Sequence, residues 1–175
     1  MGFRKTSETI RSGSIKPGIL YLDHREPLQI NSFLADNCLL PIEVVALETG
    51  DFVVEDICIE RKTVNDFAMS LMDKRLKEQR ERMLRDFPHR YILVSGTFAD
   101  CTVNIYRHSL LGALARVMAE GVNVCFGVDS DEDLVYLVIK ILENHKKIPP
   151  FKPKPKKIEK NINDDDNSFV VGIVE

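Results

Sequence analysis

Short apolar runs alternate along the chain with amphipathic segments, and this alternation predicts strands and helices in turn. The runs expected to form strands cover residues 19–22, 42–47, 52–54, 57–60, 91–94 and 122–126. Helices are expected over about 27–37, in the second half of 63–87, and over 105–120 and 129–145. Because helices alternate with strands and two strands form a hairpin, the pattern predicts a three-layer α/β domain with a mixed central sheet.

Both ends of the chain differ in composition from this central part. Residues 1–17 are polar and include Gly13 and Pro17, so we expect a flexible N-terminal arm. Residues 146–175 begin with a Pro/Lys-rich linker, which has seven lysines and four prolines within 146–160. They end in an apolar tail that could bind an additional protein partner. The predicted domain therefore covers residues 18–145.

The charge distribution limits the partners that the chain can have. The 175 residues carry a formal net charge of −3, so binding to nucleic acid needs a local basic patch. Residues 61–90 supply one, with nine lysines or arginines against five acidic residues. No apolar run approaches the roughly 20 residues of a membrane span, and the N-terminus lacks an apolar signal segment. We therefore expect no membrane association, and a cytoplasmic or nucleoid-associated protein that would be nuclear in a eukaryote.

One stretch combines acidic and basic residues in an order typical of metal-dependent phosphodiester cleavage. Asp51 starts the predicted hairpin and Glu60 lies on its return strand, so the fold-back can bring the two carboxylates level. Lys62 is two residues from Glu60 and projects from the same face of the strand. Two carboxylates suit Mg²⁺, and the ammonium can orient an attacking water or screen phosphate charge. Asp23, at the end of the first strand, could add a third carboxylate.

The same spacing also has an ordinary explanation. In a chain with 29% charged residues, an Asp-x(8)-Glu-x-Lys pattern arises by chance, and carboxylate–lysine pairs on hairpins contribute little at a surface. Here Ile57 and Ile59 place the motif beside the predicted core, and a basic helical segment follows directly. A nuclease needs such a segment to contact the DNA backbone, so these two features favour a nuclease site.

The residues around the motif resemble the nuclease domain of the XPF-type structure-specific endonucleases, which include archaeal XPF and the nuclease half of Hef. Segments 50–52, 59–67 and 70–76, with Gln79, match the family signature Gly-Asp-x(n)-Glu-Arg-Lys-x(3)-Asp. Segment 22–26 resembles the Asp-x-Arg-Glu element of the family. The resemblance covers about residues 18–145.

The resemblance implies a restriction-endonuclease-like fold of the PD-(D/E)xK type. It also implies cutting of one strand of branched DNA, at a 3′ flap or fork, with Mg²⁺ or Mn²⁺ as cofactor. By position, Asp51 and Glu60 would be catalytic metal ligands, Lys62 the catalytic lysine and Asp23 an auxiliary metal-site carboxylate. Residues expected to support these groups or to position DNA are Arg25, Glu26, Arg61, Asp66 and Arg75. For Asp66, capping of the following helix or pairing with Arg61 is the alternative role.

The chain also departs from the family pattern. Lys74 stands where a glycine is expected, in a turn where a left-handed backbone makes lysine costly. The sequence after Pro149 shows no helix-hairpin-helix pattern of the kind that grips duplex DNA in the family. The family that the chain resembles includes inactive partners, so a non-catalytic DNA-binding or scaffold subunit on the same fold is the alternative function. The presence of all the proposed acidic residues and of the lysine favours activity.

Residues 134–142 are apolar on nearly every side, with Lys140 the one charge. A helix with this pattern needs cover on two sides. One domain of this size leaves little to supply the second side, so we expect a homodimer through the C-terminal helices 105–120 and 129–145. The family resemblance points the same way. The alternative is a central helix buried wholly within one domain.

Overall fold

The computed structural model describes residues 4–150, and within these the side chains of residues 9–150. This part of the chain forms one seven-stranded sheet with five α-helices and two short 3₁₀ turns, at Ser12–Ser14 and Phe98–Asp100. The strands are β1 Arg4–Ile10, β2 Leu20–Asp23, β3 Ile42–Leu47, β4 Phe52–Val54, β5 Ile57–Thr63, β6 His89–Ser95 and β7 Asn123–Val128. The helices are α1 Leu28–Asn37, α2 Val64–Met72, α3 Arg75–Asp86, α4 Arg107–Ala119 and α5 Asp131–Asn144.

The sheet is mixed, as the sequence predicts. Its strand order is β1-β3-β2-β4-β5-β6-β7. The short strand β4 runs antiparallel to both of its neighbours, β2 and β5, whereas every other neighbouring pair is parallel. The β4–β5 hairpin therefore joins two parallel halves of the sheet, and the predicted acidic residues lie on this hairpin.

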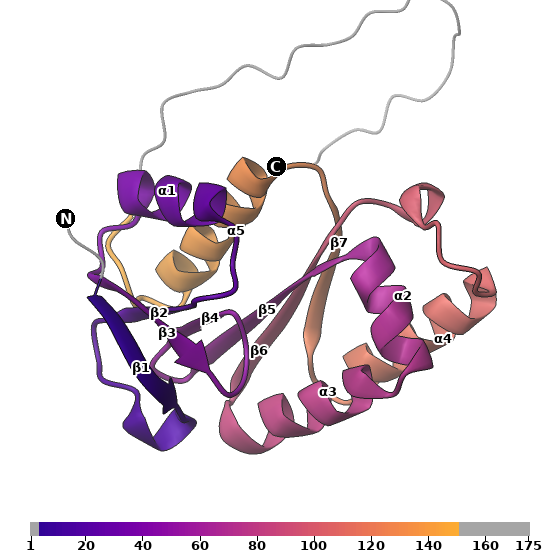
Figure 1. Cartoon of the computed structure of the whole chain (residues 1–175), viewed down its shortest axis with the longest axis horizontal. Coiled ribbons are helices and arrows are strands. Elements are labelled where there is room, and N and C mark those ends of the chain that lie inside the picture. Colours follow the sequence, from indigo (N-terminus) through magenta and orange to yellow (C-terminus); the bar gives the residue numbers. More distant parts are fainter. Residues whose placement is uncertain (1–3, 151–175) are drawn as a thin grey trace, which may run out of the picture.

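Helices cover both faces of the sheet and give three layers (Figure 1). Helices α1 and α5 lie over one face, where Ile30 and Leu34 share a core with the inner side of α5. Helices α2, α3 and α4 lie over the other face, where Phe67 and Met83 belong to a second core. Alternate residues of a strand point to opposite faces, so the strands from β2 to β7 each contribute to both cores.

The structure places a strand where the sequence predicts a flexible arm. Residues 4–10 form β1, which pairs in parallel with β3 at the edge of the sheet. The segment lacks the apolar alternation from which a strand is predicted, and its backbone pairs with β3. Residues 1–3 of the predicted arm lie outside the described residues.

The expected linker also begins later than predicted. Lys147 forms ion pairs with Glu55 and Asp56 in the β4–β5 turn, and Ile148 is buried in the core beneath α5. The domain therefore extends past residue 145. The remaining part of the expected linker and tail, residues 151–175, lies outside the described residues.

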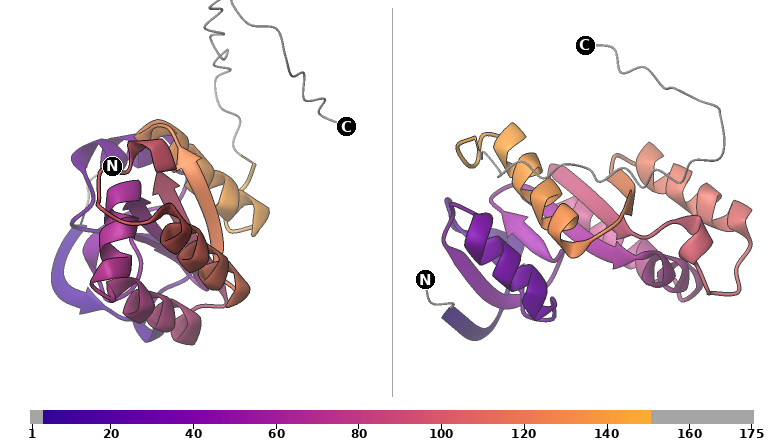
Figure 2. Two further views of the ribbon diagram at one scale, coloured as in Figure 1. Left: turned by 90° about the vertical axis from the view of Figure 1, so that its right-hand side faces the viewer. Right: turned by 90° about the horizontal axis from the view of Figure 1, so that it is seen from above.

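Helix α5 is buried within its own chain, which corrects the argument made from its sequence. Its apolar residues, including Val138 and Ile141, belong to the core that the helix shares with the sheet and with α1. Figure 2 shows α1 and α5 side by side above that face of the sheet. The second side of α5 is thus covered by α1, and its apolar pattern gives no reason to require a partner. Among residues 4–150, no helix has the length and apolar character needed to cross a membrane.

Candidate active site

The β4–β5 hairpin brings the predicted acidic residues together. Gly50 precedes the hairpin with a φ of +81°, and a Cβ built there would lie 2.4 Å from the Cys58 sulfur. Only glycine fits here without backbone strain and without displacing the buried Cys58 side chain. The Asp51 N–H then donates to the carbonyl of Ile59 (2.9 Å), and the N–H of Arg61 donates to Asp51 Oδ2 (2.7 Å). Asp51 is thereby fixed beside the strand that carries Glu60.

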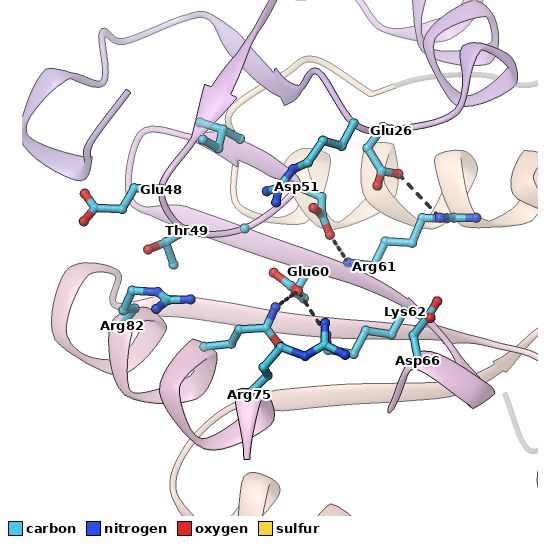
Figure 3. A pocket seen from close by; sticks show the side chains of 14 residues that line it. Glu26, Glu48, Thr49, Asp51, Glu60, Arg61, Lys62, Asp66, Arg75 and Arg82 are labelled. Atoms are coloured by element: carbon cyan, nitrogen blue, oxygen red, sulfur yellow. Dashed lines mark hydrogen bonds and ion pairs between the residues drawn. The ribbon is translucent and has the colours of Figure 1, made fainter. Parts of the chain in front are cut away.

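Glu60 and Lys62 project from β5 towards the side of the sheet covered by α3. They are two residues apart, on the same face as the core residue Cys58. Lys62 Nζ lies 3.2 Å from Glu60 Oε1, and both side chains are more than nine-tenths buried. A second donor, Gln79 Nε2 on α3, reaches the same oxygen at 2.8 Å. Glu60 and the ammonium of Lys62 therefore meet beside Asp51, as predicted (Figure 3).

The acidic groups crowd one another, and this changes their proton affinities. Burial raises the pKa of Asp51 well above its usual value, and the charges of Glu60 and Glu26 add to this effect. Burial also raises the pKa of Glu26 to about 7, although the Arg61 guanidinium opposes the shift. One oxygen of Glu26, Oε2, is buried and accepts no hydrogen bond from the described residues. A site that disfavours its own negative charges in this way is suited to a cation.

Asp23 is held differently from the other carboxylates. It is completely buried at the end of β2, and it does not line the cavity that Asp51 and Glu60 share. Its oxygens accept hydrogen bonds from the N–H of Leu47 (2.9 Å) and from the N–H and Nε of Arg25 (2.9 and 2.7 Å). Burial raises its pKa, but these hydrogen bonds outweigh burial and leave the pKa below its usual value. In the structure Asp23 fixes Arg25 and the end of β3, and its predicted role as a metal carboxylate stays a prediction.

The remaining predicted residues surround this centre. The guanidinium of Arg61 lies between Glu26 (3.8 Å) and Asp131 at the start of α5 (3.3 Å). Asp66 caps α2, because its carboxylate and Thr63 exchange hydrogen bonds in a capping box. Arg75 pairs with Asp73 at 2.6 Å. Arg25, Glu26, Arg61, Asp66 and Arg75 all line the same cavity as Asp51, Glu60 and Lys62.

The cavity has a volume of about 530 Å³ and is lined by residues from several elements. Gln79 and Arg82 line it from α3, and Thr49 lines it from the loop before the hairpin. Sequence reasoning assigned none of these three a role at the site. Two signals were available: Gln79 belongs to the segment that resembles the family, and the spacing of Gln79 and Arg82 from Arg75, four and seven residues along one helix, places all three on one face. Each of Thr49, Gln79 and Arg82 has a buried polar atom that no described residue satisfies.

The side chains at this centre fit a hard divalent cation. Within residues 4–150, no three His, Cys, Asp or Glu side chains are arranged to hold a metal by themselves. Mg²⁺ does not require such a cage, since it keeps several waters and binds through one or two carboxylates and a phosphate of the substrate. Asp51 and Glu60 supply those carboxylates, and the buried, unsatisfied oxygen of Glu26 lies near them. The donor set therefore suits Mg²⁺ or Mn²⁺ and does not suit zinc, which favours nitrogen and sulfur ligands.

Comparison with known proteins agrees with this geometry. A family model described as the ERCC4 domain matches residues 22–138. A protein of Methanocaldococcus jannaschii, named as an ATP-dependent RNA helicase, is 32% identical over 104 residues, which are 58% of this chain and 13% of that protein.

Two solved structures of XPF from Aeropyrum pernix also match. One has 26% identity and a TM-score of 0.59, and the match covers 73% of this chain and 65% of that chain. The other, a complex with DNA, has 29% identity and a TM-score of 0.54, with 75% and 65% covered. This chain thus spans just under two thirds of the XPF chains and a small part of the helicase. The sheet and its helices match the XPF nuclease domain, which has a restriction-endonuclease-like fold. Since the family match covers more than half of the sequence, the chain belongs to the ERCC4 domain family of XPF-type nucleases.

Proposed function

We propose that this chain is a divalent-metal-dependent endonuclease domain that cuts one strand of DNA near a branch, of the 3′-flap or fork type. One observation carries the proposal, namely the convergence of Asp51, Glu60 and Lys62 on a single cavity. Membership of the nuclease family supports the reaction class. A role in DNA repair and fork processing follows from this substrate class.

In the proposed reaction, water attacks the phosphorus of one phosphodiester, a new P–O bond forms, and the bond to one bridging oxygen breaks. Asp51 and Glu60 would hold Mg²⁺ or Mn²⁺, which would supply stabilisation of the phosphate charge and a lowered pKa of a bound water. Lys62 is held beside Glu60 and can donate a hydrogen bond to the attacking water or to a phosphate oxygen. The backbone N–H of Arg61 keeps Asp51 in place.

The charge at the edge of the cavity supports a nucleic-acid substrate. On α3, Arg75, Lys77, Arg80 and Arg85 each form an ion pair with an acidic side chain, so the basic segment is more nearly neutral than its sequence indicates. No ion pair joins Arg82 to any described residue, and its side chain lines the cavity. Arg82 is therefore available to contact a phosphate of the DNA backbone. The matched XPF structure in complex with DNA supports the same class of substrate.

Cleavage of labelled DNA tests this proposal directly. The substrates are a 3′ flap, a fork, a nicked duplex and a four-way junction, each incubated with Mg²⁺, Mn²⁺ or EDTA. We expect cutting near the branch with either metal and none in EDTA. Wild-type protein that binds these substrates but cuts none of them would favour the non-catalytic scaffold instead.

Three substitutions test the assigned residues. Asp51→Asn, Glu60→Gln and Lys62→Ala should each reduce the cutting rate by about 100-fold or more, because each removes a group that stabilises charge during the reaction. The matched control is Glu81→Gln, which changes an exposed carboxylate on α3. Circular dichroism and thermal unfolding should show that all four variants fold. Wild-type turnover by either carboxylate variant would contradict the site.

We also propose that the domain forms a homodimer, through a surface different from the one its α5 sequence suggests. Met69 and Met72 on α2 are 50% and 60% exposed, and Leu111 and Met118 on α4 are 40% and 54% exposed. The two helices pack against each other on one face of the sheet (Figure 1). Exposed apolar side chains on neighbouring helices are the kind of surface that a second copy of the chain could cover.

A further inference from the structure

Gln79 interrupts the apolar face through which α3 packs on the sheet. Leu76, three residues earlier, and Met83, four residues later, are both buried in that core. A helix uses positions with this spacing for one face, so an apolar residue is expected between them. The structure instead places a polar amide there, on the side where β5 carries Glu60 and Lys62. Burial of an amide lowers stability unless the group is hydrogen-bonded.

The amide nitrogen of Gln79 makes a hydrogen bond that bears on the proposed reaction. It donates to Glu60 Oε1 at 2.8 Å, and Lys62 Nζ donates to the same oxygen at 3.2 Å. Glu60 is therefore held by two donors, one from its own strand and one from α3 (Figure 3 shows Glu60 and Lys62). Both donors occupy Oε1, and no described residue donates a hydrogen bond to Oε2. This second oxygen thus stays available as a ligand.

The amide oxygen of Gln79 is left without a partner. It is buried, it accepts no hydrogen bond from the described residues, and its side chain lines the cavity. Such an acceptor lowers stability until something in the cavity donates to it. Water is the donor that the chemistry of this site would supply, because Glu60 would hold a hydrated divalent cation in the proposed reaction.

We infer that Gln79 is a positioning residue of the nuclease site, an inference that rests on the proposed function. Its Nε2 fixes Glu60 through Oε1, so that Oε2 would be free to hold the cation. Its Oε1 accepts a hydrogen bond from a water molecule held in the cavity. A glutamine at position 79 thus makes the packing of α3 on the sheet less stable and improves the geometry of the site. This combination is common at functional sites.

Gln79→Met tests this inference because methionine has a similar length and shape but no donor and no strong acceptor. The matched control is Lys77→Met, at an exposed position of the same helix where the lysine makes only a surface pair with Glu81. We expect Gln79→Met to reduce kcat by about 10- to 100-fold and to raise the Mg²⁺ concentration that gives half-maximal activity. Its KM for DNA should stay within about twofold of wild type, because Gln79 contacts Glu60.

Two further measurements separate positioning from a structural role. The Tm of Gln79→Met should equal or exceed that of wild type, since an apolar residue suits the buried face of α3. The loss of activity should be smaller in Mn²⁺ than in Mg²⁺, because Mg²⁺ demands nearly ideal octahedral geometry. An apolar substitution that merely damaged the fold would lower the Tm and affect both metals equally.

The outcomes distinguish this inference from the proposed function. If wild-type protein shows no metal-dependent cleavage, the proposed function fails and the inference fails with it. If wild type cuts DNA and Gln79→Met matches it in kcat and in Mg²⁺ dependence, only the inference is overturned. A lowered kcat together with a lowered Tm would also overturn it, because the residue would then be a structural element of α3.

Discussion

Lys74 forms the turn between α2 and α3 with a left-handed backbone, at φ 66° and ψ 1°. The side chain of an L-residue makes this conformation unfavourable by about 1–2 kcal/mol, and glycine avoids that cost. Glycine in turn loses about 0.5–1 kcal/mol more through backbone entropy on folding. The balance favours glycine slightly.

Lys74→Gly should therefore stabilise the domain by about 0.5–1 kcal/mol, which corresponds to a rise in Tm of roughly 1–4 °C. Lys77→Gly is the matched control, because it makes the same change at an exposed position inside α3, where glycine lowers stability by up to about 1 kcal/mol. Thermal unfolding of both variants checks the prediction. A lower Tm for Lys74→Gly would mean that the lysine side chain contributes to the turn in a way that its backbone does not indicate.

The sequence predicts the central residues of the site because, in a hairpin, the spacing of two residues along the chain determines whether they lie side by side. Asp51, Glu60 and Lys62 lie where the fold-back of β4 and β5 places them. Gln79 could not be assigned in the same way, because its contact with Glu60 depends on how α3 packs across the sheet. Asp23 is also decided by tertiary contacts, since the hydrogen bond from Leu47 is formed between two strands.

Lys147 fastens the chain after α5 to the turn between β4 and β5. Its Nζ lies 2.6 Å from Glu55 and 2.9 Å from Asp56. These hydrogen bonds lower the pKa of both carboxyls and raise the pKa of the Lys147 ammonium. A lowered carboxyl pKa stabilises the fold above the unfolded-state pKa, and this contribution is lost as the pH falls through the folded-state value.

Lys147→Met should therefore lower the Tm at pH 7, and the difference from wild type should narrow as the pH falls below about 4. The loss should be small, because the partners are partly exposed to solvent. The matched control is Lys146→Met, whose lysine is exposed and forms no ion pair with a described residue. Thermal unfolding between pH 3 and pH 7 checks the prediction. A difference that stays constant down to pH 3 would instead assign the effect to the apolar stem of Lys147.

Strands and helices with an apolar pattern are predicted well. Segments attached to the domain through backbone pairing or through single ion pairs are not. The expected strands and helices between residues 19 and 145 appear in the expected order, with ends shifted by a few residues, and α2 is an additional helix that the pattern did not predict. Strand β1 has no apolar alternation and owes its place to pairing with β3. The sequence predicts a linker after α5. The contacts that attach this segment to the domain come from two residues, Lys147 and Ile148, and two residues do not form a pattern from which packing can be predicted.

At the scale of the whole molecule, α5 shows how a correct local pattern led to a wrong assignment of its neighbour. Its apolar residues are buried on two sides, as the sequence requires. The second cover is α1, which lies about a hundred residues earlier in the chain and packs beside α5 on the same face of the sheet. Amphipathic patterns specify that a face is buried, and they do not specify which segment buries it.

The surface proposed for dimerisation therefore has to be tested on α4, away from α5. Leu111→Lys and Met118→Lys each place a charge on an exposed apolar position, so they should convert a homodimer into monomers of about 20 kDa without loss of the fold. Leu28→Lys is the control, because Leu28 is 84% exposed on α1, on the opposite face of the sheet.

Val138→Asp should behave differently and unfold the domain, because Val138 is fully buried and a carboxylate there would have no partner. Sedimentation equilibrium at micromolar concentration, together with thermal unfolding, checks each expectation. A wild-type protein that sediments as a monomer would contradict the proposed dimer. If Val138→Asp instead gave folded monomers, the dimer interface would lie on α5.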